Sequence, residues 1–199
     1  MTHRFIFIQA FLVAALVLAS CGQRRSPVPV ATTNPAENKE VGLSCPQSLL
    51  DFFSENAREY GRGAGAAVPL PRREELMKID AVRKICSGYG TAGMDILYLG
   101  SLDVSDSLDF HVWAMKAPSD GAPSVEAALI VKDGRAAAAL LLEDDGKESG
   151  FSVKTERLSR NEFLIGTFSL DMVEEDGKPK GGYDLATVLD NGTVSVSAR

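Results

Sequence analysis

His111 is the residue best suited to acid–base chemistry, because it is the only histidine of the chain after His3. A serine or cysteine nucleophile normally needs a nearby base to accept its proton. The sequence contains no G-x-S-x-G, H-E-x-x-H, Walker or dinucleotide-binding motif that would organise such chemistry. We therefore expect a protein that is not an enzyme and that has no catalytic residues and no cofactor.

Three carboxylates at three-residue spacing, Asp103, Asp106 and Asp109, are of the type that binds calcium. The stretch lacks the central glycine and the terminal glutamate of a known calcium-binding loop, and a polar hairpin turn is the preferred interpretation. The single histidine after the N-terminal region and the lack of a C-x-x-C motif argue against zinc. The sequence therefore predicts no metal site.

The N-terminal stretch has the pattern of a secretory signal peptide. A charged start at His3 and Arg4 leads into an apolar run from Phe5 to Ala19. A run of about 15 residues is shorter than the ~20 that cross a bilayer as a helix. We therefore expect a cleaved leader rather than a transmembrane helix.

The end of this leader reads Leu18-Ala19-Ser20-Cys21 and resembles the lipobox of bacterial lipoproteins. The resemblance covers residues 1–22 alone. It implies that residues 1–20 are removed, that Cys21 is lipidated, and that the lipid attaches the protein to a membrane of the cell envelope. Gly22 after the cysteine implies the outer membrane, facing the periplasm, if the source is diderm. The alternative is an ordinary secretory signal with a coincidental cysteine.

With Cys21 lipidated, Cys45 and Cys86 remain as an even pair in a compartment that permits disulfides. The sequence predicts that they form a disulfide, which would stabilise the fold by roughly 4 kcal/mol on the chain-entropy model. Two buried free thiols are the alternative.

The charge is concentrated in the C-terminal part. From Thr91 to Arg199 there are 19 Asp and Glu against 10 Lys and Arg, whereas Cys45 to Gly90 has 6 against 7. Such acidity argues against nucleic acid as a partner and permits a basic protein. The alternative is that the acidity serves only solubility.

Residues 21–43 hold three prolines among polar residues and are expected to form a disordered tether behind the lipidated cysteine. Residues 44–199 follow as a single α+β domain. The apolar spacing predicts a helix from Ser44 or Cys45 to Gly61 and a second from Arg72 to Cys86. A disulfide between their far ends requires an antiparallel helix pair, so we expect a helical hairpin over residues 44–90.

Residues 91–199 show the two-residue period of strands, with Asp-Gly or Asn-Gly turns between several of the runs. These runs predict an antiparallel β-meander of about eight strands on which the helices pack. The sheet is expected either to stay open or to curl toward a barrel. The expected strands are Ile96–Asp103, Leu108–Lys116, Val125–Lys132, Arg135–Glu143, Phe151–Leu158, Glu162–Val173, Tyr183–Asp190 and Thr193–Ala198.

His111 and Trp113 alternate with Phe110 and Val112 along one of these strands. If the helices cover the Phe110 face, Trp113 is exposed and suits an interaction hot spot. If both faces are covered, Trp113 belongs to the core. We expect the partner-binding residues to be His111 and Trp113 together with the acidic hairpin tip Glu143, Asp144 and Asp145.

These patterns favour an envelope-anchored lipoprotein that acts as a non-catalytic protein-binding module. Inhibition of a basic cell-wall-targeting enzyme, or immunity against one, would fit the acidic surface. The alternatives are a periplasmic carrier of an apolar ligand and a structural subunit of an envelope assembly. A continuous apolar cavity would favour the carrier.

Overall fold

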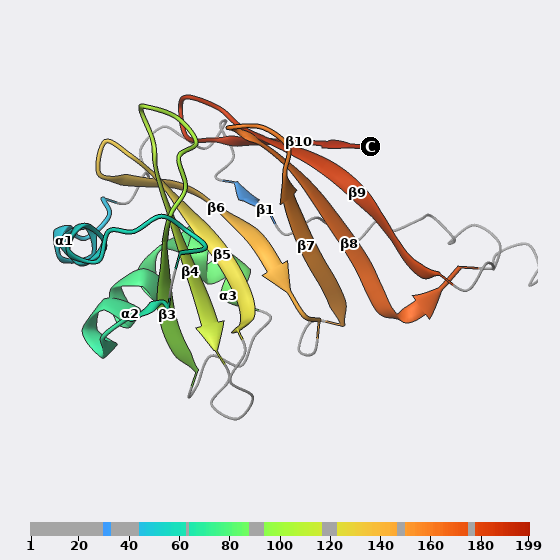
Figure 1. Cartoon of the computed structure of the whole chain (residues 1–199), viewed down its shortest axis with the longest axis horizontal. Coiled ribbons are helices and arrows are strands. Elements are labelled where there is room, and N and C mark those ends of the chain that lie inside the picture. Colours follow the sequence, from blue (N-terminus) through green and yellow to red (C-terminus); the bar gives the residue numbers. More distant parts are fainter. Residues whose placement is uncertain are drawn as a thin grey trace, which may run out of the picture.

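A twisted antiparallel sheet dominates the protein (Figure 1). The computed structural model describes residues 30–32, 44–62, 64–87, 94–116, 123–146, 150–174 and 178–199. From β2 to β10 the strands follow one another in sequence order, and β1 pairs with β6 outside this path. The bounds are β1 (Val30–Thr32), β2 (Ala66–Ala67), β3 (Asp95–Ser101), β4 (Asp109–Lys116), β5 (Pro123–Lys132), β6 (Arg135–Asp144), β7 (Phe151–Arg157), β8 (Glu162–Val173), β9 (Pro179–Val188) and β10 (Val194–Ala198).

The expected meander is confirmed, because the eight predicted runs correspond to β3 through β10. At the turn between β5 and β6, Asp133 and Gly134 both have positive φ, at 50° and 71°. These are the angles that a two-residue hairpin turn requires. The sheet is not closed, since β2 and β10 lie at its two ends in the strand order. The Asp176-Gly177 turn lies outside the described residues.

Three short helices replace the expected pair, namely α1 (Gln47–Glu55), α2 (Leu70–Lys78) and α3 (Asp80–Cys86). The predicted second helix is interrupted at Ile79, whose extended backbone ends α2 and begins α3. Asp80 pairs with Arg83 and Lys84 in the first turn of α3, where a carboxylate is favourable. The molecule is therefore mostly β, and the expected α+β domain with a pair of helices of nearly equal length is matched only loosely. No helix among the described residues is long and apolar enough to span a membrane.

The helices cover the face of the sheet that carries His111, which we name the outer face. The Phe53 ring of α1 stacks on His111 with 4.2 Å between ring centroids and lies 5.0 Å from the Tyr98 ring of β3. The inner face carries Phe110, which stacks on Phe163 of β8 at 5.7 Å. Because β4 and β8 are not neighbours in the sheet, this contact means that the sheet curls until its two halves face each other.

The curl is centred between β6 and β7, where the ladder has only two residue pairs, Glu143 with Lys154 and Asp144 with Val153. β1 pairs with Ala138 to Leu140 on the edge of β6 from which β7 has separated. The predicted tether therefore contains a strand at Val30–Thr32. Its other residues, like Cys21 and the predicted signal peptide, lie outside the described part of the chain.

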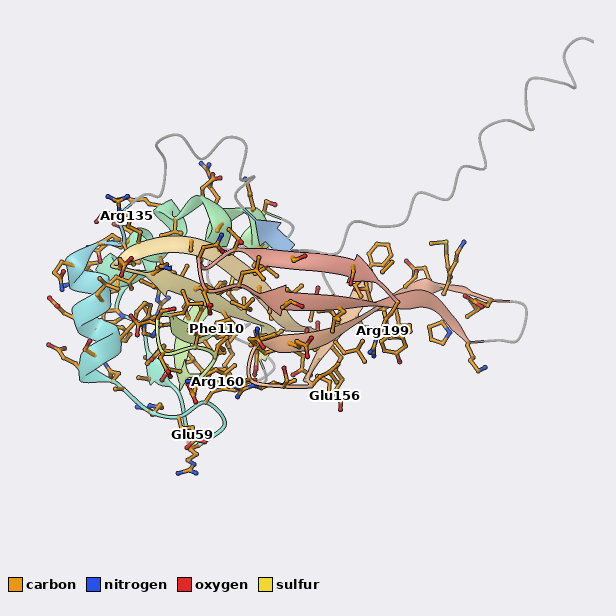
Figure 2. All side chains as sticks on the ribbon, turned by 90° about the horizontal axis from the view of Figure 1, so that it is seen from above. Glu59, Phe110, Arg135, Glu156, Arg160 and Arg199 are labelled. Carbon is orange, nitrogen blue, oxygen red and sulfur yellow. The ribbon has the colours of Figure 1, made fainter. Side chains whose placement is uncertain are left out.

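The two halves are also joined at one end of the molecule. Arg160, in the turn after β7, pairs with Asp103 and Asp106 in the connection between β3 and β4 (Figure 2). Arg157 donates to the Asp103 carbonyl, and Lys132 Nζ donates to the Asp190 carbonyl at 2.6 Å. Asp103 and Asp106 thus serve as partners of Arg160.

Candidate functional site

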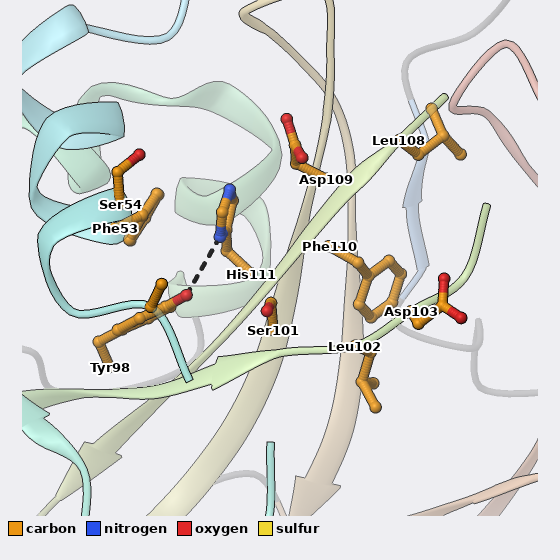
Figure 3. A pocket seen from close by; sticks show the side chains of 11 residues that line it. Phe53, Ser54, Tyr98, Ser101, Leu102, Asp103, Leu108, Asp109, Phe110 and His111 are labelled. Atoms are coloured by element: carbon orange, nitrogen blue, oxygen red, sulfur yellow. Dashed lines mark hydrogen bonds between the residues drawn. The ribbon is translucent and has the colours of Figure 1, made fainter. Parts of the chain in front are cut away.

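A pocket with a volume of about 320 Å³ lies between α1 and the start of β4. We name it the His111 pocket (Figure 3). α1 contributes Phe53 and Ser54, and the β3–β4 hairpin contributes Tyr98, Asp103, Asp109 and His111.

His111 is held in place on two sides. Its Nδ1 lies 3.3 Å from the Tyr98 hydroxyl, and its ring stacks on Phe53. Burial lowers the pKa of His111 to about 4, although the Asp109 carboxylate acts in the opposite direction. The imidazole is therefore neutral at neutral pH, and its Nε2 bonds to no residue that the structure describes.

The hydroxyls of the pocket are engaged elsewhere. Ser54 Oγ donates to the Leu50 carbonyl at 3.0 Å, and Ser101 Oγ donates to the Arg58 carbonyl at 3.3 Å. Within the described residues neither hydroxyl bonds to His111, so the pair needed to activate a nucleophile is not formed.

Trp113 is fully buried, with 0% of its surface exposed. The prediction that it contacts a partner was wrong, and the alternative that it belongs to the core is confirmed. The reason is that the helices cover the His111 and Trp113 face rather than leaving it open. The indole Nε1 has no hydrogen-bond partner among the described residues.

The predicted acidic tip is only partly a surface feature. Glu143 and Asp145 are exposed, but Asp144 is 3% exposed and its Oδ1 accepts a hydrogen bond of 2.8 Å from the Gly146 amide. Asp144 thus shapes the turn after β6 instead of facing a partner. Glu143 lines a second pocket of about 120 Å³ with Tyr60, so the structure does not bring the acidic tip together with His111.

Cys45 and Cys86 are free, buried thiols, which corrects the predicted disulfide. The Cys45 amide donates to the Gly134 carbonyl at the β5–β6 turn, while Cys86 ends α3. Burial raises the pKa of Cys86 to about 12, and burial together with Glu75 raises that of Cys45 to about 11.

Sequence reasoning missed a set of apolar side chains along the hairpin of β8 and β9, of which Leu170, Met172 and Val173 lie beyond the last residue that pairs with β7. Four of its side chains are exposed by 49% to 66%, and Phe168 packs edge-on against one of them at 5.4 Å. We name this set the hairpin surface, and its members are Phe168, Leu170, Met172, Val173 and Tyr183. The available signal was length, because β8 has 12 residues while its neighbour β7 has 7 and pairs with it only as far as Ser169.

The described residues contain no group of three or more His, Cys, Asp or Glu side chains arranged to hold a metal ion. The chain matches no protein-family model, and neither a curated protein nor a solved structure is significantly similar to it.

Proposed function

We propose that this protein is a lipid-anchored envelope protein whose domain binds another protein and catalyses no reaction. The anchor would be Cys21 after removal of residues 1–20, and in a diderm cell it would hold the domain at the outer membrane, facing the periplasm. The resemblance of Leu18–Cys21 to a lipobox supports this placement.

The hairpin surface is the observation that carries the binding function. Single exposed apolar side chains are ordinary, but several along one hairpin are typical of an interaction site. Leu170, Met172, Val173 and Tyr183 are 53%, 49%, 66% and 51% exposed. Tyrosine and methionine are also among the residues enriched in protein interfaces.

The charge of the domain favours a basic partner. The surplus of nine acidic residues from Thr91 to Arg199 includes the exposed Glu143 and Asp145. If a Cβ were added to Gly146, it would lie 2.7 Å from Leu170 Cδ1, so the turn that carries Asp145 lies beside the hairpin surface. An apolar centre beside carboxylates suits a basic protein, such as a cell-wall-targeting enzyme that this protein would inhibit or neutralise.

The packing of the core supports a binding protein over a carrier. Phe110 and Phe163 stack across the curl of the sheet, and Ile130 and Leu140 are fully buried. The pockets of about 320 and 120 Å³ both contain charged residues. An apolar carrier requires a larger and drier cavity. A structural role in an envelope assembly would use the same binding surface.

A crosslinking experiment in the native cells tests the proposal. The full chain carries a photoreactive phenylalanine analogue at Met172 or, as a control, at the exposed Glu55 of α1. We expect a specific crosslinked protein from position 172 and none from position 55, and Tyr183→Ser should weaken the crosslink. Specific products from position 55 alone would refute this surface, and no product from either position would refute the binding function.

A further inference from the structure

The His111 pocket contains polar groups that the fold leaves without partners. The exposed Asp109 carboxylate makes no hydrogen bond or ion pair with the described residues, although it lies close enough to influence the pKa of His111. Figure 3 places Asp109, His111 and Ser54 around the same opening, with one ring nitrogen of His111 directed away from Tyr98.

The groups that face the opening are mainly acceptors. Ser54 and Ser101 use their protons on backbone carbonyls, so each hydroxyl presents lone pairs to a ligand. Asp109 adds an exposed carboxylate to this lining. A positively charged donor complements this arrangement.

The positive charges near the pocket are already engaged. Arg58 donates to the carbonyls of Asn56 and Ala64, and Arg160 pairs with Asp103 and Asp106. His111 is neutral at neutral pH because of its burial. A cation that enters beside Asp109 therefore meets a carboxylate that pairs with no described residue, while the nearby arginine side chains are held by hydrogen bonds or ion pairs of their own.

We propose that the His111 pocket receives an arginine or lysine side chain of the protein partner and pairs it with Asp109. The volume of about 320 Å³ is at the small end of ligand pockets, which suits one side chain better than a larger molecule. The proposal rests on the proposed function, since it names the chemistry of the partner that the hairpin surface binds. It also gives the domain a way to select a basic partner.

Nuclear magnetic resonance of the imidazole tests the pocket directly. His111 is the only histidine after residue 20, so the processed full chain gives a single imidazole signal. The probe is Nα-acetyl-arginine amide, and the matched control is Nα-acetyl-citrulline amide, which has nearly the same shape without the charge. We expect the arginine probe to cause a saturable change in the chemical shift of the His111 imidazole, and the citrulline probe to bind at least tenfold more weakly.

Three variants locate the site. Asp109→Asn should weaken binding of the arginine probe about tenfold, and Ala57→Leu should also weaken it, because Ala57 lines the pocket and a larger side chain there would narrow it. Asp133→Asn removes an equivalent exposed carboxylate outside the pocket and should leave binding within twofold. Equal binding of both probes, or no effect of Asp109→Asn in a protein with an otherwise unchanged spectrum, would overturn the proposal.

The crosslink at position 172 separates this inference from the proposed function. If Asp109→Asn weakens binding of the arginine probe and also reduces the yield of the crosslink from position 172, the pocket holds a side chain of the partner. Weaker binding of the probe with an unchanged crosslink yield would overturn the assignment to the partner. It would indicate that the ligand of the pocket is a free small cation. A crosslink that persists without any probe binding would refute the pocket and leave the binding function standing.

Discussion

The two halves of the sheet are built from similar strands but differ in how they are covered. In the half from β3 to β6, the inner face packs against the other half and the outer face lies under the helices. In the half from β7 to β10, no helix packs on the outer face within the described chain (Figure 1). All of Val112 to Met115 in β4 are buried, whereas in β9 only Ala186 and Val188 are.

The difference shows that alternation alone does not determine burial. The side chains of β4 point alternately to the two faces of the sheet. Both faces are buried, because the helices cover the outer face and the other half of the sheet covers the inner face. β8 and β9 carry aromatic and aliphatic side chains on the uncovered side, and these stay exposed. A stabilising role is therefore expected in the covered half and a recognition role at the projecting end of the other.

Replacing a large aromatic residue in each half should give the largest contrast. Trp113→Ala should lower the free energy of unfolding by about 3–5 kcal/mol, because it leaves a cavity in a fully buried site. Tyr183→Ala, at a half-exposed site, should cost about 1 kcal/mol or less. Urea unfolding of both variants measures the difference, and equal losses would mean that the second half is covered as well.

The covered half should also have a pH dependence of its own. Because burial lowers the pKa of His111 from 6.5 to about 4, the unfolded chain binds the proton first as the pH falls. The stabilisation is complete above pH 6.5 and is lost between pH 6.5 and 4, to an extent of about 3 kcal/mol. His111→Phe should remove this part of the pH dependence.

Unfolding of the wild type and the variant at pH 7 and pH 4 provides the measurement. Carboxylates with a lowered pKa, such as Asp80 and Asp103, titrate in both proteins, so the difference between the two isolates the histidine. A constant difference at the two pH values would show that His111 is accessible to water and protons.

The reactivity of the Cys45 and Cys86 thiols measures how well the covered half is buried. In the folded protein Cys45 and Cys86 should react with a thiol reagent at least about a hundredfold more slowly than in urea, because they are buried and their pKa values are raised. In urea without reductant, two reactive thiols are expected per processed chain. Three would show that Cys21 carries no lipid, and none would show that Cys45 and Cys86 form a disulfide.

Substitutions in the hairpin surface should have the smallest effect on stability and a large effect on binding of the partner. Leu170→Ser and Met172→Ser should change the free energy of unfolding by no more than about 0.5 kcal/mol, because both side chains are about half exposed. Each should reduce the crosslink to the partner from a neighbouring position such as Val173. A large loss of stability would instead indicate that this end of the hairpin packs against another part of the chain.

Local patterns were sufficient to predict the strands from β3 to β10, since their period and turn residues are features of neighbouring positions. They were insufficient for β1, a three-residue strand that pairs with the edge of β6 that β7 leaves open, far away in the sequence. The break at Ile79 was also missed, because the apolar spacing continues through it while the backbone bends.

The candidate site was predicted only in part. His111 stood out because it is nearly unique in the sequence, and the structure places it in the wall of a pocket. The interpretation of Trp113 depended on which face the helices cover, and a two-residue period cannot decide that. Asp144 looks like its neighbours in sequence, but the turn folds its carboxylate back onto the Gly146 amide.

The pairing of β1 with β6 has a mechanical consequence. Any tension applied to the chain from the N-terminal side, where the proposed lipid lies, reaches the folded domain first at Val30–Thr32. The ladder that joins this strand to β6 has three residue pairs and lies beside the two-pair ladder between β6 and β7. A modest load would therefore peel β1 away before disturbing the rest of the sheet, and would uncover the edge of β6 from Ala138 to Leu140.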